Sequence, residues 1–192
     1  MRITGRRLNP RRRGKFIGVI FLCGVVVFLG VQLVWRAARP LMHMDLIETY
    51  ATAENFDPFF VLALVRVESG FSKTAKSHRG AVGLMQLMPE TGKEMAMRLG
   101  MDPAQTNLAD PETNIRLGVH YLGVLRQEFG EDPVALLAAY NGGPRNVRKW
   151  IKNGPLTIQD IPFSETRTFV TRVLATEKSI RRLQQVKGFF HD

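Results

Sequence analysis

Residues 57–91 read DPFFVLALVRVESGFSKTAKSHRGAVGLMQLMPET, and we expect the fold to be organised around this stretch. It opens on Asp57, whose side chain can accept a backbone N–H, and on Pro58, which suits the first position of a helix. Residues 59–67 are apolar except for Arg66. This pattern predicts a helix buried in the core rather than one with a solvated face.

Glu68 stands at the C-terminal end of that helix, one turn after Leu64 and Val65. Apolar neighbours and the negative end of the helix dipole both disfavour the ionised carboxylate, so its pKa should be raised. A carboxyl group that is still protonated near neutral pH is what a general acid needs. The ordinary alternative is a structural carboxylate, solvated or paired with a neighbour such as Arg66.

The first 40 residues differ from the rest of the chain because they carry nine basic residues and no acidic one. Residues 16–35 are uncharged and polar only at Gln32. As a helix they would span about 30 Å, the thickness of the hydrocarbon core of a bilayer. Seven basic residues precede this segment and two follow it. The positive-inside rule therefore predicts a membrane anchor with a cytoplasmic N-terminus.

A cleavable signal peptide is the alternative interpretation of this segment. We favour an uncleaved anchor, because the apolar region of a signal peptide is usually about 7–15 residues long. The anchor also explains the net charge of +10, since residues 41–192 contribute only +1 of it. The basic composition is thus a topology signal, and we expect no nucleic-acid partner.

Several kinds of site are not indicated by the sequence. The single cysteine, Cys23, lies in the apolar segment, so neither a disulfide framework nor a thiolate metal site is expected. The four histidines are scattered without metal-ligand spacing, and the chain has no glycine-rich phosphate loop and no Gly-x-Ser-x-Gly motif. We therefore expect no metal and no cofactor.

The remaining residues, about 150, predict one helical domain. Plausible helix starts stand at four Asp-Pro pairs, which begin at Asp57, Asp102, Asp110 and Asp132, and at Met88-Pro89-Glu90. After Pro111, apolar residues recur at helical spacing up to Phe129. Further helices are expected over residues 44–55, over residues 134–140 and from Ser164, the last with its apolar residues in the core at Phe169, Val173, Ile180 and Leu183. The fold class is therefore all-α, a mainly helical domain preceded by one transmembrane helix.

Four motifs follow one another in this domain: ESGF at residues 68–71, SHRGAVGLMQLMP at 77–89, AAYNGGP at 138–144 and ETR at 165–167. In this order they resemble the motifs of the soluble-type (family 1) lytic transglycosylase domain, whose fold is similar to goose-type lysozyme. The resemblance covers about residues 42–185. Together with the predicted anchor, it divides the chain into a basic cytoplasmic N-terminus (1–15), an anchor (16–35), a linker (36–42) and a lysozyme-like catalytic domain (43–192).

The resemblance implies an enzyme that cleaves the β-1,4 bond between N-acetylmuramic acid and N-acetylglucosamine in peptidoglycan without water. Glu68 would protonate the glycosidic oxygen and then, as a base, take the proton of the muramoyl C6 hydroxyl, giving a 1,6-anhydromuramoyl end. One carboxylate suffices because the attacking hydroxyl belongs to the substrate, whereas ordinary glycosidases need two carboxylates about 5–10 Å apart.

The resemblance also implies a set of substrate-binding residues in the groove: Ser77, Met85, Gln86, Tyr140, Asn141 and Glu165. Among them, Ser77 would orient the sugar and the hydroxyl of Tyr140 would reach the catalytic carboxyl. Without the motifs, core packing would be the favoured interpretation of Met85 and an equally natural one of Tyr140, and Glu165 could simply cap the last helix. The chain departs from the family at Phe169, where the family often has tyrosine.

Two alternatives stay open, a hydrolytic muramidase of the same fold and a non-catalytic peptidoglycan-binding protein. The expected location is the bacterial inner membrane, single-pass, with the catalytic domain in the periplasm. The sequence identifies no protein partner, and it does not decide between cleavage within glycan strands and cleavage from their ends.

Overall fold

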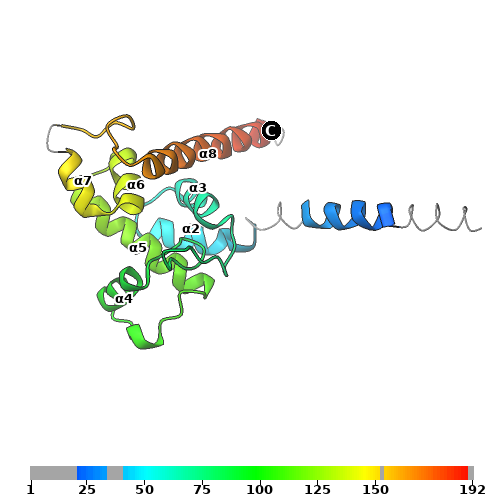
Figure 1. Ribbon diagram of the computed structural model, residues 1–192, viewed down its shortest axis with the longest axis horizontal. Coiled ribbons are helices and arrows are strands. Elements are labelled where there is room, and N and C mark those ends of the chain that lie inside the picture. Colours follow the sequence, from blue (N-terminus) through cyan, green and yellow to red (C-terminus); the bar gives the residue numbers. More distant parts are fainter. Residues whose placement is uncertain (1–20, 34–40, 152–153, 190–192) are drawn as a thin grey trace, which may run out of the picture. The chain divides into compact units, whose positions relative to one another are not determined.

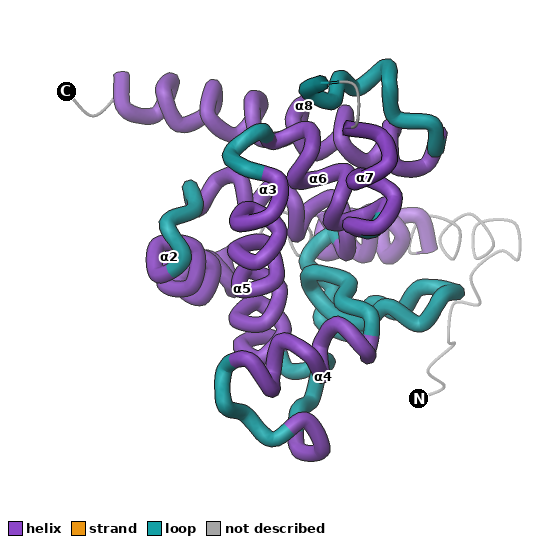
Figure 2. Tube along the Cα trace, turned by 90° about the vertical axis from the view of Figure 1, so that its left-hand side faces the viewer, coloured by secondary structure: helices purple, strands orange, loops and turns teal. Residues whose placement is uncertain are grey.

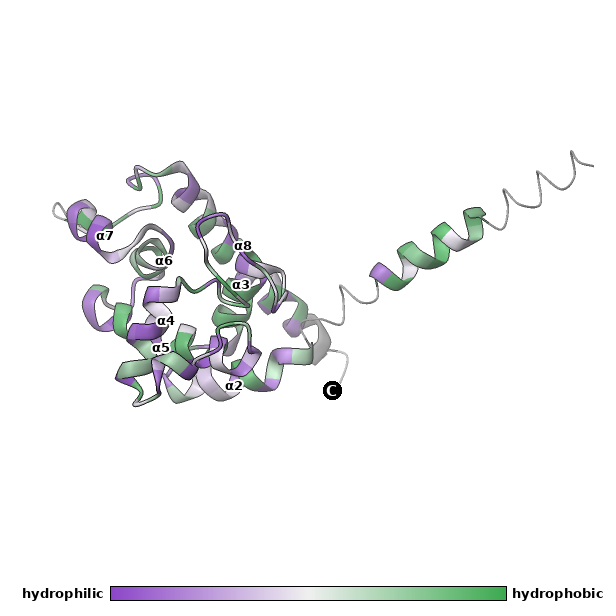
Figure 3. Ribbon diagram, turned by 60° about the horizontal axis from the view of Figure 1, so that its bottom comes forward, coloured by the Kyte–Doolittle hydropathy of each residue, from purple (hydrophilic) through white to green (hydrophobic). Residues whose placement is uncertain are grey.

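The structure, a computed structural model, describes residues 21–33, 41–151 and 154–189 (Figure 1). The contacts between Cα atoms divide the chain into two compact units, Met1–Leu41 and Met42–Asp192. In the first unit residues 21–33 are helical and mostly apolar (Figure 3). Their side chains are exposed. No helix within the described ranges is both long enough and apolar enough to cross a membrane. Residues 16–20 and 34–35 of the predicted anchor lie outside those ranges.

The second unit is built from helices, as predicted, and the described residues form no strand. Two isolated β-bridges, Lys76–Val82 and Val82–Leu87, occur in the loop that follows α3. The elements in chain order are η1 (Leu41–His43), α2 (Met44–Ala53), α3 (Pro58–Ser69), α4 (Pro89–Arg98), η2 (Pro103–Gln105), α5 (Pro111–Phe129), α6 (Pro133–Gly142), α7 (Pro144–Trp150) and α8 (Ser164–Phe189).

Each Asp-Pro pair begins a helix, as its local chemistry predicts. The aspartate accepts a backbone N–H two or three residues later, and proline takes the first helical position, where its missing N–H removes no helical bond. The four caps are Asp57 to Phe59, Asp102 to Ala104, Asp110 to Thr113 and Asp132 to Val134, at 2.7–3.0 Å.

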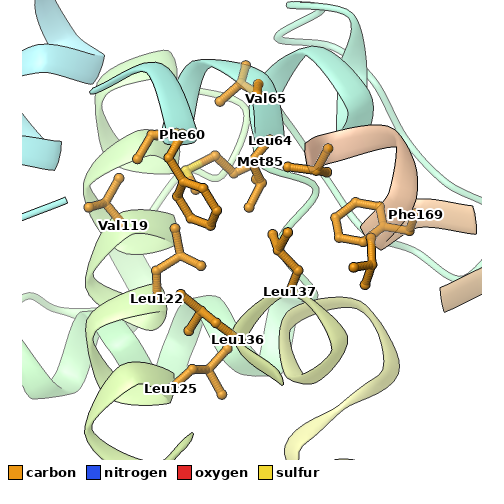
Figure 4. Close-up of a cluster of buried hydrophobic side chains, with 14 of the residues drawn as sticks. Phe60, Leu64, Val65, Met85, Val119, Leu122, Leu125, Leu136, Leu137 and Phe169 are labelled. Atoms are coloured by element: carbon orange, nitrogen blue, oxygen red, sulfur yellow. The ribbon is translucent and has the colours of Figure 1, made fainter. Parts of the chain in front are cut away.

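The core lies where α3, α5, α6 and α8 meet (Figure 4). Residues 60–65 of α3 are all buried, in agreement with their almost continuous apolar sequence. They pack with the apolar faces of α5 and α6 and with Phe169 of α8, and α2 lies alongside α3 and α5 (Figure 2). The residue that departs from the family pattern, Phe169, is thus a core side chain.

Three expectations for the helices need correction. Helix α6 runs on to Gly142 rather than ending at Tyr140, because Gly143 N–H still bonds to the Ala139 carbonyl. Helix α7 was not predicted, and Val147 is its only buried residue. Leu183 is 66% exposed rather than in the core, since residues 181–185 of α8 are all exposed.

Candidate active site

A cleft of about 610 Å³ opens where the end of α3, the loop between α3 and α4, the end of α6 and the start of α8 converge. It brings together parts of the chain that lie up to about 100 residues apart in the sequence. Its lining residues are Glu68, Ser77, His78, Arg79, Ala81, Gln86, Met88, Tyr140, Asn141 and Glu165.

Glu68 occupies the last turn of α3, which ends at Gly70 in a left-handed conformation. Its side chain is half-buried, and burial raises the pKa of the carboxyl from 4.5 to about 8, while the positive charge of Arg172 on α8 acts in the opposite direction. Arg66, the expected partner in the ordinary interpretation, is exposed and forms no ion pair with Glu68. The carboxyl is therefore protonated at neutral pH, as the sequence predicted from its apolar neighbours.

The loop after α3 presents Ser77 and Gln86 to the cleft. The Ser77 hydroxyl accepts the backbone N–H of Ala81 at 3.0 Å. The side-chain amide of Gln86 donates to the carbonyls of Gly83 at 2.8 Å and Ala75 at 3.2 Å, and Gln86 itself has a φ of +48°. Both side chains thus hold the shape of the loop that they line.

Asn114 of α5 anchors this loop from within the protein. Its side chain is fully buried, accepts the N–H of Met85 at 2.7 Å, and donates to the carbonyls of Val82 at 2.9 Å and Leu108 at 2.8 Å. Gly83, with a φ of +84°, lies so close that a Cβ there would overlap the Asn114 amide. One buried amide therefore fixes the backbone that carries Gln86, because all three of its hydrogen bonds go to main-chain groups.

Tyr140, at the end of α6, hydrogen-bonds to this loop and not to the carboxyl of Glu68. Its hydroxyl donates to the carbonyl of Met85 at 2.7 Å, so the expected bond to Glu68 is not formed in this structure. Burial, followed by the negative charge of Glu68, raises the pKa of Tyr140 well above its usual value. The hydroxyl therefore stays protonated and acts as a donor.

Met85 does not line the cleft, so the structure contradicts the prediction that its side chain contacts substrate. The side chain is fully buried in the core, and it packs so closely on Gly118 of α5 that a Cβ there would overlap its sulfur. The methionine in the cleft is Met88, which is 43% exposed.

The other two predicted residues, Asn141 and Glu165, line the cleft. Glu165 lies in the first turn of α8 and forms an ion pair with Arg79 of the loop, at 3.1 Å. Both side chains of the pair are mostly exposed, so the pair contributes at most about 1 kcal/mol and can open at little cost. It joins two walls of the cleft that are 86 residues apart.

Sequence reasoning missed several residues of the cleft. Four of them stand inside the quoted loop motif: His78, Arg79, Ala81 and Met88. Their closeness in sequence to Ser77 and Gln86 could have indicated that they line the cleft. Arg172 gave no signal, because only the packing of α8 on α3 brings it near Glu68. In the described ranges no group of three or more His, Cys, Asp or Glu side chains is placed to hold a metal ion.

Comparison with known proteins relates this domain to one family. The family described as the transglycosylase SLT domain matches residues 45–157. The chain is 38% identical over 152 residues to a soluble lytic murein transglycosylase of Escherichia coli, covering 74% of this chain and 23% of that protein. It is 30% identical over 158 residues to a membrane-bound lytic murein transglycosylase C of Actinobacillus pleuropneumoniae, covering 77% and 40%.

Solved structures give the same relationship. An inactive mutant of the lytic transglycosylase Slt from Pseudomonas aeruginosa superposes with a TM-score of 0.67 at 38% identity, over 72% of this chain and 24% of that one. A 70-kDa soluble lytic transglycosylase in complex with bulgecin A superposes with a TM-score of 0.69 at 36% identity, over 76% and 25%. The chain thus spans about a quarter to two fifths of the length of these relatives.

Proposed function

Because the chain belongs to the transglycosylase SLT domain family, we propose that it is a peptidoglycan lytic transglycosylase in which Glu68 acts first as general acid and then as general base. The observation that carries the proposal is a carboxyl group with a pKa of about 8 in a cleft of about 610 Å³. Such a group holds a proton at neutral pH and can give it to a leaving oxygen.

The environment of Glu68 suits both halves of this reaction. Burial keeps the carboxyl protonated before cleavage, when the glycosidic oxygen must receive a proton. After that transfer the carboxylate is charged, and the positive charge of Arg172 stabilises it. It then takes the proton of the muramoyl C6 hydroxyl as that oxygen bonds to C1, which closes the 1,6-anhydro ring and leaves Glu68 protonated again.

The remaining cleft residues would bind and orient the glycan. The loop residues Ser77 and Gln86 are held by hydrogen bonds to backbone, so their geometry is set before substrate arrives. Tyr140 would act on the reaction through the Met85 carbonyl and the loop. Asn141 and Glu165 offer further polar groups in the cleft.

A hydrolytic muramidase is the second candidate, and one observation bears on it. Glu165 places another carboxylate in the cleft, and a hydrolase needs a second carboxylate as nucleophile or as base for water. In this structure Arg79 holds one carboxylate oxygen of Glu165 at 3.1 Å, so that oxygen would have to leave the pair before it could attack C1 or activate water.

Mass spectrometry of the products separates these candidates. A lytic transglycosylase leaves 1,6-anhydromuramoyl ends, about 18 Da lighter than the reducing ends of a hydrolase, because the substrate's own positioned hydroxyl replaces water. Glu165→Gln should retain the anhydro product, whereas Glu68→Gln should release neither product. Reducing ends from the wild-type protein would identify a hydrolase. If the folded protein cleaves no glycan, the remaining function is non-catalytic binding of peptidoglycan.

We also propose that residues 16–35 anchor the chain in the bacterial inner membrane, with the catalytic domain in the periplasm. The support is the uncharged segment with seven basic residues before it and two after it. A reporter that works only outside the cytoplasm, fused after Asp192, should be active. Activity of a cytoplasm-only reporter at that position would reverse the orientation, and a mature chain that starts near Arg39 would indicate cleavage.

A further inference from the structure

We propose that Trp150 and Phe163 form an aromatic subsite that extends the cleft and binds a sugar ring of the glycan strand beyond the rings held at Glu68. This inference rests on the proposed function, since it takes a glycan as the ligand of the cleft. It concerns residues outside the cleft lining described above.

Phe163 has an unusual exposure for an aromatic residue of this domain. Its side chain is 47% exposed, whereas every other Phe, Tyr and Trp of residues 42–151 and 154–185 is buried or half-buried. It is also absent from the side chains that pack on the core. Its ring meets the ring of Trp150 edge to face, with centroids 5.1 Å apart.

The position of Phe163 also breaks a local rule. Its carbonyl accepts the N–H of Arg167 at 2.9 Å, so it occupies the cap position immediately before α8. Ser, Thr, Asp or Asn at such a position stabilises a helix by accepting a backbone N–H, and phenylalanine offers no capping group. Departures from local preference of this kind are expected where a side chain serves function.

The aromatic pair adjoins the cleft through both of its members. Phe163 precedes Glu165 by two residues, and the ring of Trp150 lies against Gly142, the neighbour of Asn141. A Cβ on Gly142 would come within 3.2 Å of both Trp150 and Thr166, so the glycine permits this approach. The pair therefore lies next to the parts of α6 and α8 that carry Asn141 and Glu165.

The segment that carries Phe163 is held in place. The Arg167 guanidinium donates twice to the Ile161 carbonyl, at 2.8 and 3.2 Å, and the side chains of Ile161 and Thr166 are buried. A rigid, exposed aromatic surface is what binding of a pyranose ring requires. β-1,4-linked N-acetylhexosamines present a face of axial C–H bonds and an N-acetyl methyl group, which pack on aromatic rings, while their polar groups reach side chains such as Asn141.

The first test measures kinetics of the full-length protein on peptide-free glycan strands of two lengths, tetrasaccharides and long strands. Phe163→Ala should raise KM for long strands on the order of 3- to 10-fold, with kcat and the KM for tetrasaccharides little changed. Phe163→Tyr should retain the wild-type KM. The matched control is Leu183→Ala, since Leu183 is an exposed apolar residue in the C-terminal part of α8, far from the cleft in sequence.

The second test measures binding without catalysis, by calorimetry of long strands with Glu68→Gln and with Glu68→Gln combined with Phe163→Ala. Weaker binding by the double variant, with an unchanged urea midpoint, supports the subsite. Equal affinities, or a loss of affinity that is the same for tetrasaccharides and long strands, would overturn it. If the wild-type protein cleaves no glycan, the proposed function fails, while this binding comparison still decides on the subsite.

Discussion

Glu68→Gln should change how stability depends on pH, because Glu68 is protonated in the folded protein over a range where it is ionised in the unfolded chain. The pKa is about 8 in the cleft and near 4.5 when unfolded. Below pH 4 both states hold the proton, so folding does not have to bury a charged carboxylate. Between about pH 4.5 and pH 8 only the folded state holds it, so the free energy of unfolding of the wild-type protein falls as pH rises.

The size of the effect follows from the two pKa values. At about 1.4 kcal/mol for each pKa unit, the difference between 4.5 and about 8 corresponds to about 5 kcal/mol once pH exceeds 8. The carboxyl opens onto a cleft that water enters, which lowers this cost. We therefore expect at least about 2 kcal/mol of the wild-type stability to be lost between pH 4 and pH 9 through this one group.

The assay is urea denaturation of the full-length protein and of Glu68→Gln across that range, followed by tryptophan fluorescence. Glutamine keeps the size of the side chain and has no charge to bury, so the two proteins should have similar stability at pH 4 and the variant should be the more stable at pH 9. Glu90→Gln is the matched control, because the Glu90 side chain is 86% exposed. Effects of pH on other groups cancel in each comparison.

A difference in stability between the wild-type protein and Glu68→Gln that stays constant from pH 4 to pH 9 would refute this reasoning. It would mean that Glu68 ionises normally and cannot be the proton donor. Activity gives the companion readout, since the variant should lose at least about 10²-fold in kcat.

Three further results are expected. The kcat/KM of the wild-type protein should fall as pH rises through about 8. Arg172→Gln should move this fall to higher pH, because the positive charge of Arg172 lowers the pKa of Glu68. An unchanged pH profile in the variant would contradict this effect of Arg172. Tyr140→Phe should lower kcat more than it raises KM, by less than the 10²–10⁴-fold typical of a general acid–base group, and wild-type kinetics would limit the tyrosine to packing. In thermal or urea unfolding, Asn114→Ala should lower the free energy of unfolding by about 1–3 kcal/mol, because it leaves buried main-chain groups unpaired. Gly83→Ala should lower it by about 2–4 kcal/mol, because the new Cβ would strain the backbone and overlap the Asn114 amide. A neutral result for either variant would show that the loop does not depend on the buried amide.

The parts of the fold that were predicted correctly depend on interactions within a few residues. A capping aspartate and the proline after it act within one turn, so all four Asp-Pro helix starts could be read from the sequence. The direction of the Glu68 pKa shift was also predictable, because the apolar run before Glu68 indicated that the carboxyl stands at the end of a buried helix. Short or extended helix ends were harder, and α7 and the last turn of α6 were missed where glycine and proline indicated a turn.

The sequence by itself determined the helical class of the domain, the starts of its helices, the candidate acid and its family resemblance. Only the tertiary structure decided which residues share the cleft with Glu68. It placed Met85 in the core and Met88 in the cleft, because the backbone around Gln86 turns with a positive φ that no periodicity reveals. It also brought Arg79 to Glu165 across 86 residues, since contacts between distant segments depend on how helices pack and not on local sequence.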